Sequence, residues 1–150
     1  MSKLDKITVE TSPQVFHSLT WNFHVSEIII NELISKAKQN QNNKARLCLH
    51  PTKDSNIQVT YLAFIAPYKD KIHQHPIHPE IIIPVIGKAK MQIYDDNLDL
   101  IEELVLEGSK KMAVSNERKN WHALVVDSDC FVMVEIGGGP FTKNSTVYFS

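Results

Sequence analysis

The sequence predicts an all-β domain, mostly antiparallel, with one α-helix near its N-terminal end. Three observations support this prediction. Beyond about residue 45, short apolar segments rich in β-branched residues recur between turn residues, as they do in sandwiches and barrels. The connections between these segments are short, which favours antiparallel neighbours. Before that point, one stretch of the chain repeats its apolar residues at helical spacing.

The predicted helix covers residues 26–38. Its apolar residues recur three and four positions apart and would form one continuous face. Ser26 is a suitable N-cap, and lysines in the last turn suit the negative end of the helix dipole. Ahead of the helix, apolar residues between Ile7 and Phe23 suggest packed extended pieces.

The predicted strands follow one another through the rest of the chain. They cover residues 57–66, 80–86, 88–94, 98–106, 112–114, 123–126 and 131–136. Gly87 would form a turn, the Asp95-Asp96-Asn97 turn would close a hairpin, and Gly137-Gly138-Gly139 would end the last strand. We expect one structural domain, in which residues 1–44 pack with their helix on a barrel formed by residues 45–150.

Composition excludes several classes of protein. The 150 residues can bury a core without disulfides, and the net charge of -1 shows no basic excess for nucleic acid. No apolar run approaches the roughly 20 residues that cross a bilayer, and the N-terminus does not read as a secretory signal. Cys48 and Cys130 lack a motif spacing, so we expect reduced thiols in a cytoplasmic protein that binds neither nucleic acid nor membrane.

The strongest functional signal is the segment 73–80, which reads HQHPIHPE. In an extended segment, residues two apart share a face, so His73 and His75 can direct two imidazoles at one point. The prolines keep this segment out of a helix, which lets Glu80 return to the same point. Two imidazoles and a carboxylate suit iron, manganese, nickel or zinc. The alternative is a chance His-x-His pair in a surface loop.

A fourth ligand is available from His122, which follows the polar turn 115–120 at the start of a later strand. If that strand lies beside the strand that follows His75, a set of three histidines and one glutamate is complete. Such a set leaves coordination positions open for water or substrate. We therefore predict one divalent transition metal (Fe, Mn, Ni or Zn) per chain, held by His73, His75, Glu80 and His122.

The spacing of His73, His75, Glu80 and Gly87 resembles the first cupin motif, in which four residues separate the second His from Glu and six separate Glu from Gly. Of the second cupin motif, only His122 remains. The resemblance implies a cupin β-barrel, or jelly roll, with a metal site.

From Arg46 to Phe141 the chain is similar to the short WbuC-type cupin metalloproteins found with bacterial O-antigen and surface-polysaccharide genes. The matching pieces are residues 46–50, Asp54, Gln58, 73–80 with Gly87, Trp121-His122, Glu135-Ile136 and 139–141. The chain departs from that pattern at Gln74, Gly137 and Phe141, where Arg, Lys and Tyr are usual. The resemblance implies a sugar or sugar nucleotide as the small polar ligand.

A second group of residues could bind the ligand or support the metal site. Arg46 suits a carboxylate or phosphate, or could pair with an acid of the chain. Glu135 lies in an apolar strand and needs a partner, either a ligand histidine or Arg46. Gln58 would point into the barrel, and Tyr61 could line a sugar pocket or belong to the core. His50 and His78 complete these candidates, although His17, His24 and His50 have no partner at a motif spacing.

Three functions remain open at this point. The first is a metal-dependent isomerase or epimerase acting on a sugar or sugar nucleotide. The second is an iron-dependent dioxygenase, and the third is a non-catalytic module that binds metal and ligand. The sequence does not identify catalytic residues. We also expect a homodimer, because the domain is small and rich in strands and its helix is apolar on one face.

Overall fold

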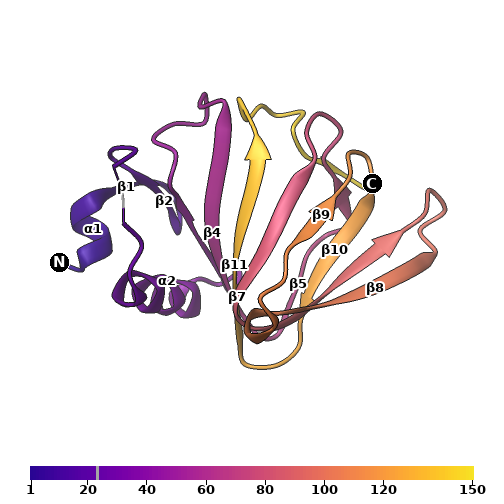
Figure 1. The fold of residues 1–150 in the computed structure, drawn as a ribbon, viewed down its shortest axis with the longest axis horizontal. Helices are drawn as coiled ribbons and strands as arrows, with labels where there is room; N and C mark the ends of the chain where they lie inside the picture. The colour runs from indigo at the N-terminus through magenta and orange to yellow at the C-terminus, as the bar shows by residue number, and fades with distance from the viewer. Residues whose placement is uncertain (23) are drawn as a thin grey trace.

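The computed structural model describes residues 1–22 and 24–150 (Figure 1). The expectation for Phe23 therefore lies outside the described residues. The elements in chain order are α1 (Lys3–Ile7), β1 (Thr8–Ser12), β2 (Val15–Ser18), α2 (Glu27–Gln39), β3 (Lys44–Cys48), β4 (Ile57–Ile65), β5 (Tyr68–Lys69), β6 (His73–Gln74), β7 (Glu80–Tyr94), β8 (Leu100–Glu107), the 3-10 helix η1 (Gly108–Lys110), β9 (Val114–Asn116), β10 (Trp121–Val126), β11 (Cys130–Gly138) and β12 (Val147–Tyr148).

The strands pair in the order β1-β2-β3-β4-β11-β7-β10-β6-β12, with β5 beside β10 and with β8 and β9 beside β7. Every pairing is antiparallel except that of β2 with β3, so the prediction of an all-β, mostly antiparallel fold is confirmed. Figure 1 shows the two helices together at the N-terminal side of the sheet. No helix of the described part of the chain is long and apolar enough to cross a membrane.

The long strand β7 joins two sheets. Its first half pairs with β11 and β9 in the first sheet, and its second half pairs with β8 and β10 in the second sheet. Apolar side chains from both sheets pack between them and form the barrel interior. They are Leu62, Phe64, Ile82, Ala89, Met91, Leu106, Leu124, Val126, Phe131 and Met133.

Gly87 bends β7 and does not end it, so the predicted turn between two strands was wrong. Its φ of +75° lies in the left-handed region, where a residue with a Cβ is strained. A Cβ there would also overlap the carbonyl oxygen of Cys130 on β11. The glycine lets the strand change direction while its backbone stays paired. That bend carries the strand from one sheet into the other.

The helix α2 confirms the prediction for residues 26–38. Ser26 precedes it as the N-cap, but the serine side chain makes no capping hydrogen bond. The buried face of α2, formed by Ile29, Leu33 and Ala37, packs on the outer surface of the first sheet. The short helix α1 is held against α2, because the Glu32 carboxylate accepts hydrogen bonds from two backbone N–H groups of α1.

Several strands differ from their predicted bounds. The strand predicted at 112–114 is observed two residues later, as β9. The strand β10 begins two residues earlier than predicted, at Trp121. The strand β11 continues through Gly137 and Gly138, because glycine backbone still pairs with β4 and β7. The strands β1, β2, β3, β5, β6 and β12 were not among the predicted strands. The N-terminal pieces gave no clear periodicity, and β5, β6 and β12 are only two residues long.

Candidate metal centre

The strands β6, β7 and β10 bring the four predicted ligands together. The strand β10 lies between β6 and β7, with His122 opposite His73 of β6 and Ile93 of β7. The ring centroids are 4.4 Å apart for His73 and His122, 5.1 Å for His73 and His75, and 5.3 Å for His75 and His122. Each ring offers one nitrogen within 4.8 Å of the others. The strand that carries His122 therefore lies beside the strand that follows His75, as the prediction required.

Glu80, the first residue of β7, is buried between two of these imidazoles. Its Oε2 lies 3.1 Å from Nε2 of His75, and its Oε1 lies 3.2 Å from Nε2 of His122. Its side chain is only 6% exposed. The two prolines before it keep the segment out of a helix, as expected, and the carboxylate returns to the pair of histidines.

Each of the three imidazoles has its Nδ1 within hydrogen-bond distance of a backbone carbonyl oxygen. The partners of His73, His75 and His122 are the carbonyls of Lys71 (2.8 Å), Ser145 (3.1 Å) and Asn120 (2.8 Å). A carbonyl only accepts, so Nδ1 carries the proton that it donates. Nδ1 of His122 also lies 3.1 Å from the amide nitrogen of Asn116, which donates to Glu80 when Nδ1 donates to Asn120. In the neutral ring, Nε2 then holds the lone pair that a metal requires.

Asn116 is a member of the site that the sequence did not reveal. It is buried on β9, opposite Glu80 of β7, and its Nδ2 donates to Oε1 of Glu80 at 3.2 Å. Its Oδ1 has no hydrogen-bond partner among the described residues. An asparagine in a polar turn carries no metal signal by itself. It was found only because β9 pairs with the start of β7.

The donor set fits a divalent transition metal. Two ligand atoms that are each about 2.1 Å from one ion, at right angles, lie about 3 Å apart. The separations of 3.1 and 3.2 Å between Glu80 oxygens and histidine nitrogens match this spacing. The three Nε2 lone pairs and one carboxylate form a nitrogen and oxygen set that suits iron, manganese, nickel or zinc.

The electrostatics of the site favour the protonation states that a metal needs at His73 and Glu80. Burial and the neighbouring His122 lower the pKa of His73 to about 4. Burial acts to raise the pKa of Glu80, but hydrogen bonds from His122 and His75 hold it well below its usual range. Burial acts to lower the pKa of His75, and the hydrogen bond and charge of Glu80 outweigh it and raise that pKa. At neutral pH the carboxylate is ionised and His73 is neutral.

Glu135 lies on the same face of the first sheet as the metal centre. It pairs in register with Ile82 of β7, two residues from Glu80, and it is half-buried. Burial, with the charge of Glu80, raises the pKa of Glu135. Within residues 1–22 and 24–150 it forms no ion pair with Arg46 and no hydrogen bond to a ligand histidine, so the two expected pairings are not observed. Arg46 itself is exposed on β3.

The other predicted residues lie away from the four ligands. Gln58 shares a face of β4 with Thr60 and Leu62, and its amide donates to the carbonyls of Ser55 and Lys53 in the loop before the strand. Tyr61 packs with the apolar cluster under α2 and therefore faces away from the barrel interior. The ring of His78 lies against Gly138. His50 is buried in a different group, with His17 and Cys48, which no sequence spacing had indicated.

A hollow of about 370 Å³ opens at Pro79, the residue before Glu80. Glu117, Arg118 and Lys119 line the rest of it. The backbone N–H of Lys119 donates to the carbonyl of His75 at 3.3 Å, which ties this loop to the histidine segment. The loop therefore brings two cationic residues to the edge of the site.

Comparison with known families gives one match. The family model described as a domain of unknown function, DUF6016, matches residues 25–106, more than half of the chain. No curated protein matches the chain.

Solved structures share the fold. They include the capsular polysaccharide assembling protein CapF of Staphylococcus aureus, which is 18% identical over 74% of this chain and 30% of that chain, with a TM-score of 0.64. An oxalate oxidase in complex with glycolate is 16% identical over 73% of this chain and 56% of that chain, with a TM-score of 0.57. The oxalate decarboxylase of Lactobacillus farciminis is 14% identical over 63% of this chain and 27% of that chain, with a TM-score of 0.52.

The matched region spans between about a quarter and just over half of these longer chains. At such low identity the likeness concerns the fold alone. It confirms the expected cupin barrel with its N-terminal helix.

Proposed function

The chain belongs to the DUF6016 family, a domain of unknown function, and from its site we propose that it is a cupin-fold metalloenzyme. One divalent transition metal is held by His73, His75, Glu80 and His122. The substrate is a small polar molecule, a sugar or sugar nucleotide, and the reaction is an isomerisation or epimerisation.

One observation carries this proposal. Three imidazoles donate from Nδ1 to backbone carbonyls, and two of their Nε2 atoms meet the two oxygens of one buried glutamate. A hydrogen-bonded core needs no such arrangement, because both nitrogens of His75 and His122 would have to be protonated to donate. A metal held by these residues would replace the two protons and keep every Nδ1 hydrogen bond.

The bound metal would supply a Lewis acid that polarises a substrate oxygen. The residues of the chain supply the remaining functions. Asn116 fixes the orientation of the Glu80 carboxylate through its 3.2 Å hydrogen bond. Glu135 can hold a proton at its carboxyl oxygens and transfer it, because its raised pKa favours the protonated form. The apolar side chains of the barrel interior exclude water from this face.

Two considerations support a sugar substrate. CapF, a structural neighbour, is named as a capsular polysaccharide assembling protein, and the sequence is similar to WbuC-type cupins. Arg118 and Lys119 line the hollow together with Glu117, so two cations against one carboxylate leave positive charge for an anionic group such as a phosphate. We include WbuC-type membership in the proposal, with an altered anionic subsite, since Gln74 and Gly137 stand where that family has Arg and Lys.

Elemental analysis of the protein purified without an affinity tag tests the metal centre. The His73→Ala, His75→Ala double variant should lose one equivalent of metal per chain, because two of four ligands are gone. The matched control is the His24→Ala, His78→Ala double variant, which removes two histidines outside the set and should keep the wild-type stoichiometry. An unchanged metal content in the first variant contradicts the proposal.

The identity of the metal and the reaction with oxygen test the proposed chemistry. A non-redox metal, together with interconversion of sugar or sugar-nucleotide isomers, is the expected result. Iron with oxygen consumption would replace the isomerase by a dioxygenase. A fully loaded protein that binds such a ligand and leaves it unchanged would be a binding module.

A further inference from the structure

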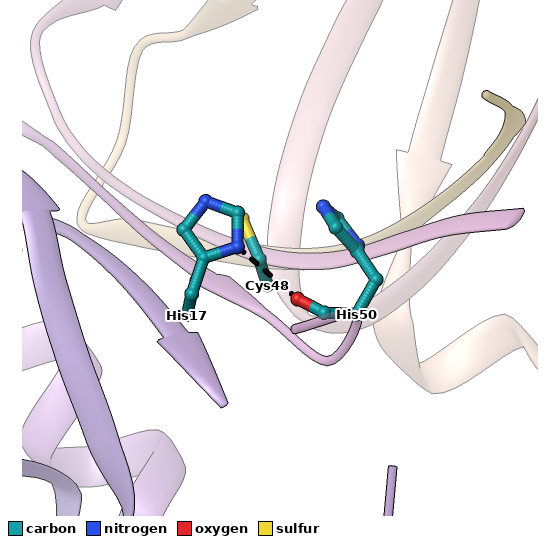
Figure 2. Close-up of side chains that lie close together, drawn as sticks. All are labelled: His17, Cys48 and His50. Carbon is teal, nitrogen blue, oxygen red and sulfur yellow. Dashed lines mark hydrogen bonds between the residues drawn. The ribbon is translucent and has the colours of Figure 1, made fainter. Parts of the chain in front are cut away.

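A second group of ligand-type side chains lies at the N-terminal edge of the first sheet. It consists of His17 on β2, Cys48 at the end of β3, and His50 two residues later (Figure 2). One nitrogen of each ring and the Cys48 sulfur all lie within 4.8 Å of one another. Cys48 is 6% exposed and His50 is 3% exposed, while His17 is half-buried. The group is therefore enclosed by the protein.

The parallel pairing of β2 with β3 creates this cluster. It places His17 in register with Cys48, so both residues lie on one face of the sheet. After β3 the chain turns, and the N–H of Leu49 donates to the carbonyl of Val59 at 2.8 Å. The turn brings the ring of His50 edge-on to the ring of His17, with centroids 5.2 Å apart. Figure 2 shows the Cys48 sulfur beside these two rings.

The cluster lies on the barrel side of the sheet. Cys48 pairs in register with Thr60 of β4, Thr60 with Glu135 of β11, and Glu135 with Ile82 of β7. Residues in register across paired strands project to the same face. Ile82 belongs to the interior apolar cluster, so this row faces the interior. The cluster thus shares a face with Glu80, and it is formed by other strands.

The hydrogen bonds leave ligand atoms available. Nδ1 of His17 donates to the carbonyl of His50 at 3.1 Å, which leaves a lone pair on Nε2. Nδ1 of His50 lies 3.0 Å from the backbone N and 3.1 Å from the carbonyl oxygen of Val59. It can accept from that N–H in the metal-free protein, or donate to that carbonyl when Nε2 binds a metal. Metal binding at this cluster would therefore change the tautomer of His50.

A catalytic thiol does not fit this environment. Burial raises the pKa of Cys48 to about 11, so the metal-free thiol is neutral and a poor nucleophile. One sulfur and two imidazoles are instead ligands that Zn²⁺ prefers. A divalent cation would displace the thiol proton and so balance the charge of the thiolate.

We propose that His17, Cys48 and His50 form a second metal site, for Zn²⁺ or a similar thiophilic divalent cation. The bound ion has one thiolate and two imidazole ligands, with a fourth position open to water. It links β2 to β3 and to the turn before β4, and so adds to the three register pairs of β2 with β3 and to the hydrogen bond from the Ser18 hydroxyl to the Leu49 carbonyl. The site is independent of the proposed enzymatic function.

Titration with Co²⁺ tests this proposal, because cobalt bound to a thiolate gives a sulfur-to-metal charge-transfer absorption. The chain has two cysteines, so in the Cys130→Ser variant any such band must come from Cys48. Cys130 is half-buried and lies outside the cluster, and circular dichroism verifies that this variant folds. The band should appear in the wild type and in Cys130→Ser, and should be absent in Cys48→Ser. Absence of the band in Cys130→Ser overturns the proposal.

Histidine variants test the remaining ligands. His17→Ala and His50→Ala should each weaken the Co²⁺ affinity of the charge-transfer site by at least about tenfold, because each variant removes one ligand of the metal. His24→Ala removes an exposed histidine outside the cluster and serves as the control, with circular dichroism to verify folding. Unchanged affinity in His17→Ala would contradict the assignment.

The His73→Ala, His75→Ala double variant separates the two proposals. The first site has no sulfur ligand, so loss of that site should leave the charge-transfer band in place. Failure of one proposal therefore does not resemble failure of the other. A band that disappears in this variant would overturn the second site as an independent one.

Discussion

Glu80 contacts two histidines at once, because its two carboxylate oxygens face different imidazole rings. The hydrogen bond from Asn116 adds a third interaction to the same carboxylate. These neighbours lower the pKa of Glu80 and so favour its ionised form. The protein therefore holds a negative charge at a buried position. The His73 ring is close by, and burial favours its neutral form.

The shifted pKa values of these histidines should make the stability of the metal-free protein depend on pH. The pKa of His73, about 4 in the folded chain, lies below its ordinary value of about 6.5, so the unfolded chain takes up the proton first. The free energy of unfolding therefore falls as the pH falls through this window. For His75 the raised pKa has the opposite sign: its contribution is present below about pH 6.5 and is lost as the pH rises through the folded value.

Urea unfolding of chelator-treated protein measures the effect. Between about pH 6.5 and pH 4.5, the wild type should lose more stability than the His73→Gln variant, which has no imidazole to protonate. Equal losses in the two proteins would show that His73 is not held neutral by the fold.

The strand β7 organises the site because it belongs to both sheets. Its first residue is the glutamate of the metal centre, and its second half carries β10 with His122. Gly87 lies at the junction of these halves, where the strand passes from pairing with β11 to pairing with β8. The register with β11 shifts nearby, between Ile86 and Pro84, so both features mark the passage from one sheet to the other.

Substitution of Gly87 by alanine should therefore destabilise the protein by at least about 2 kcal/mol, because a Cβ is strained at this φ and overlaps the Cys130 carbonyl. Gly137→Ala is the matched control: its Cβ would meet only the Pro79 carbonyl oxygen, at 3.9 Å, and the expected change is below about 1 kcal/mol. Thermal or chemical unfolding compares the two. Similar losses in both would contradict the role of Gly87.

The apolar face of α2 is covered by the chain's own sheet, so it does not provide a dimer interface. Exposed apolar side chains lie elsewhere, on β8, where Leu100, Ile101 and Val105 are about half exposed or more. Among the described strands, β8 pairs with β7 on one side only. An edge strand with apolar side chains is a surface on which a second copy can pair.

The homodimer remains a prediction, now placed on β8. Light scattering at micromolar concentration should give twice the 17.1 kDa mass of the chain. Ile101→Lys should shift the protein toward the monomer, because a charge on the paired edge opposes association. Ile28→Lys changes an exposed isoleucine of α2 and should leave the dimer intact. A wild-type monomer at this concentration would end the prediction.

Features with a local cause could be predicted from the sequence by itself. The helix at 27–39 follows from its 3.6-residue periodicity, and the β7–β8 hairpin follows from alternation and turn residues. His73, His75 and Glu80 lie within eight residues, so backbone geometry alone was enough to aim them at one point. The cupin fold followed from the same spacing, through its resemblance to a known motif.

Other features required the tertiary structure, because alternation assigns a side chain to one of two faces but does not say which strands pair. Pairing decided that Asn116 meets Glu80 and that Tyr61 faces the helix. It also joined His17 to Cys48 and His50, some thirty residues away in sequence. The sequence by itself determined which residues can bind a metal at the first site. The tertiary structure decided which distant residues lie beside the proposed first site and which form the proposed second one, since contacts between distant segments depend on the packing of the whole chain.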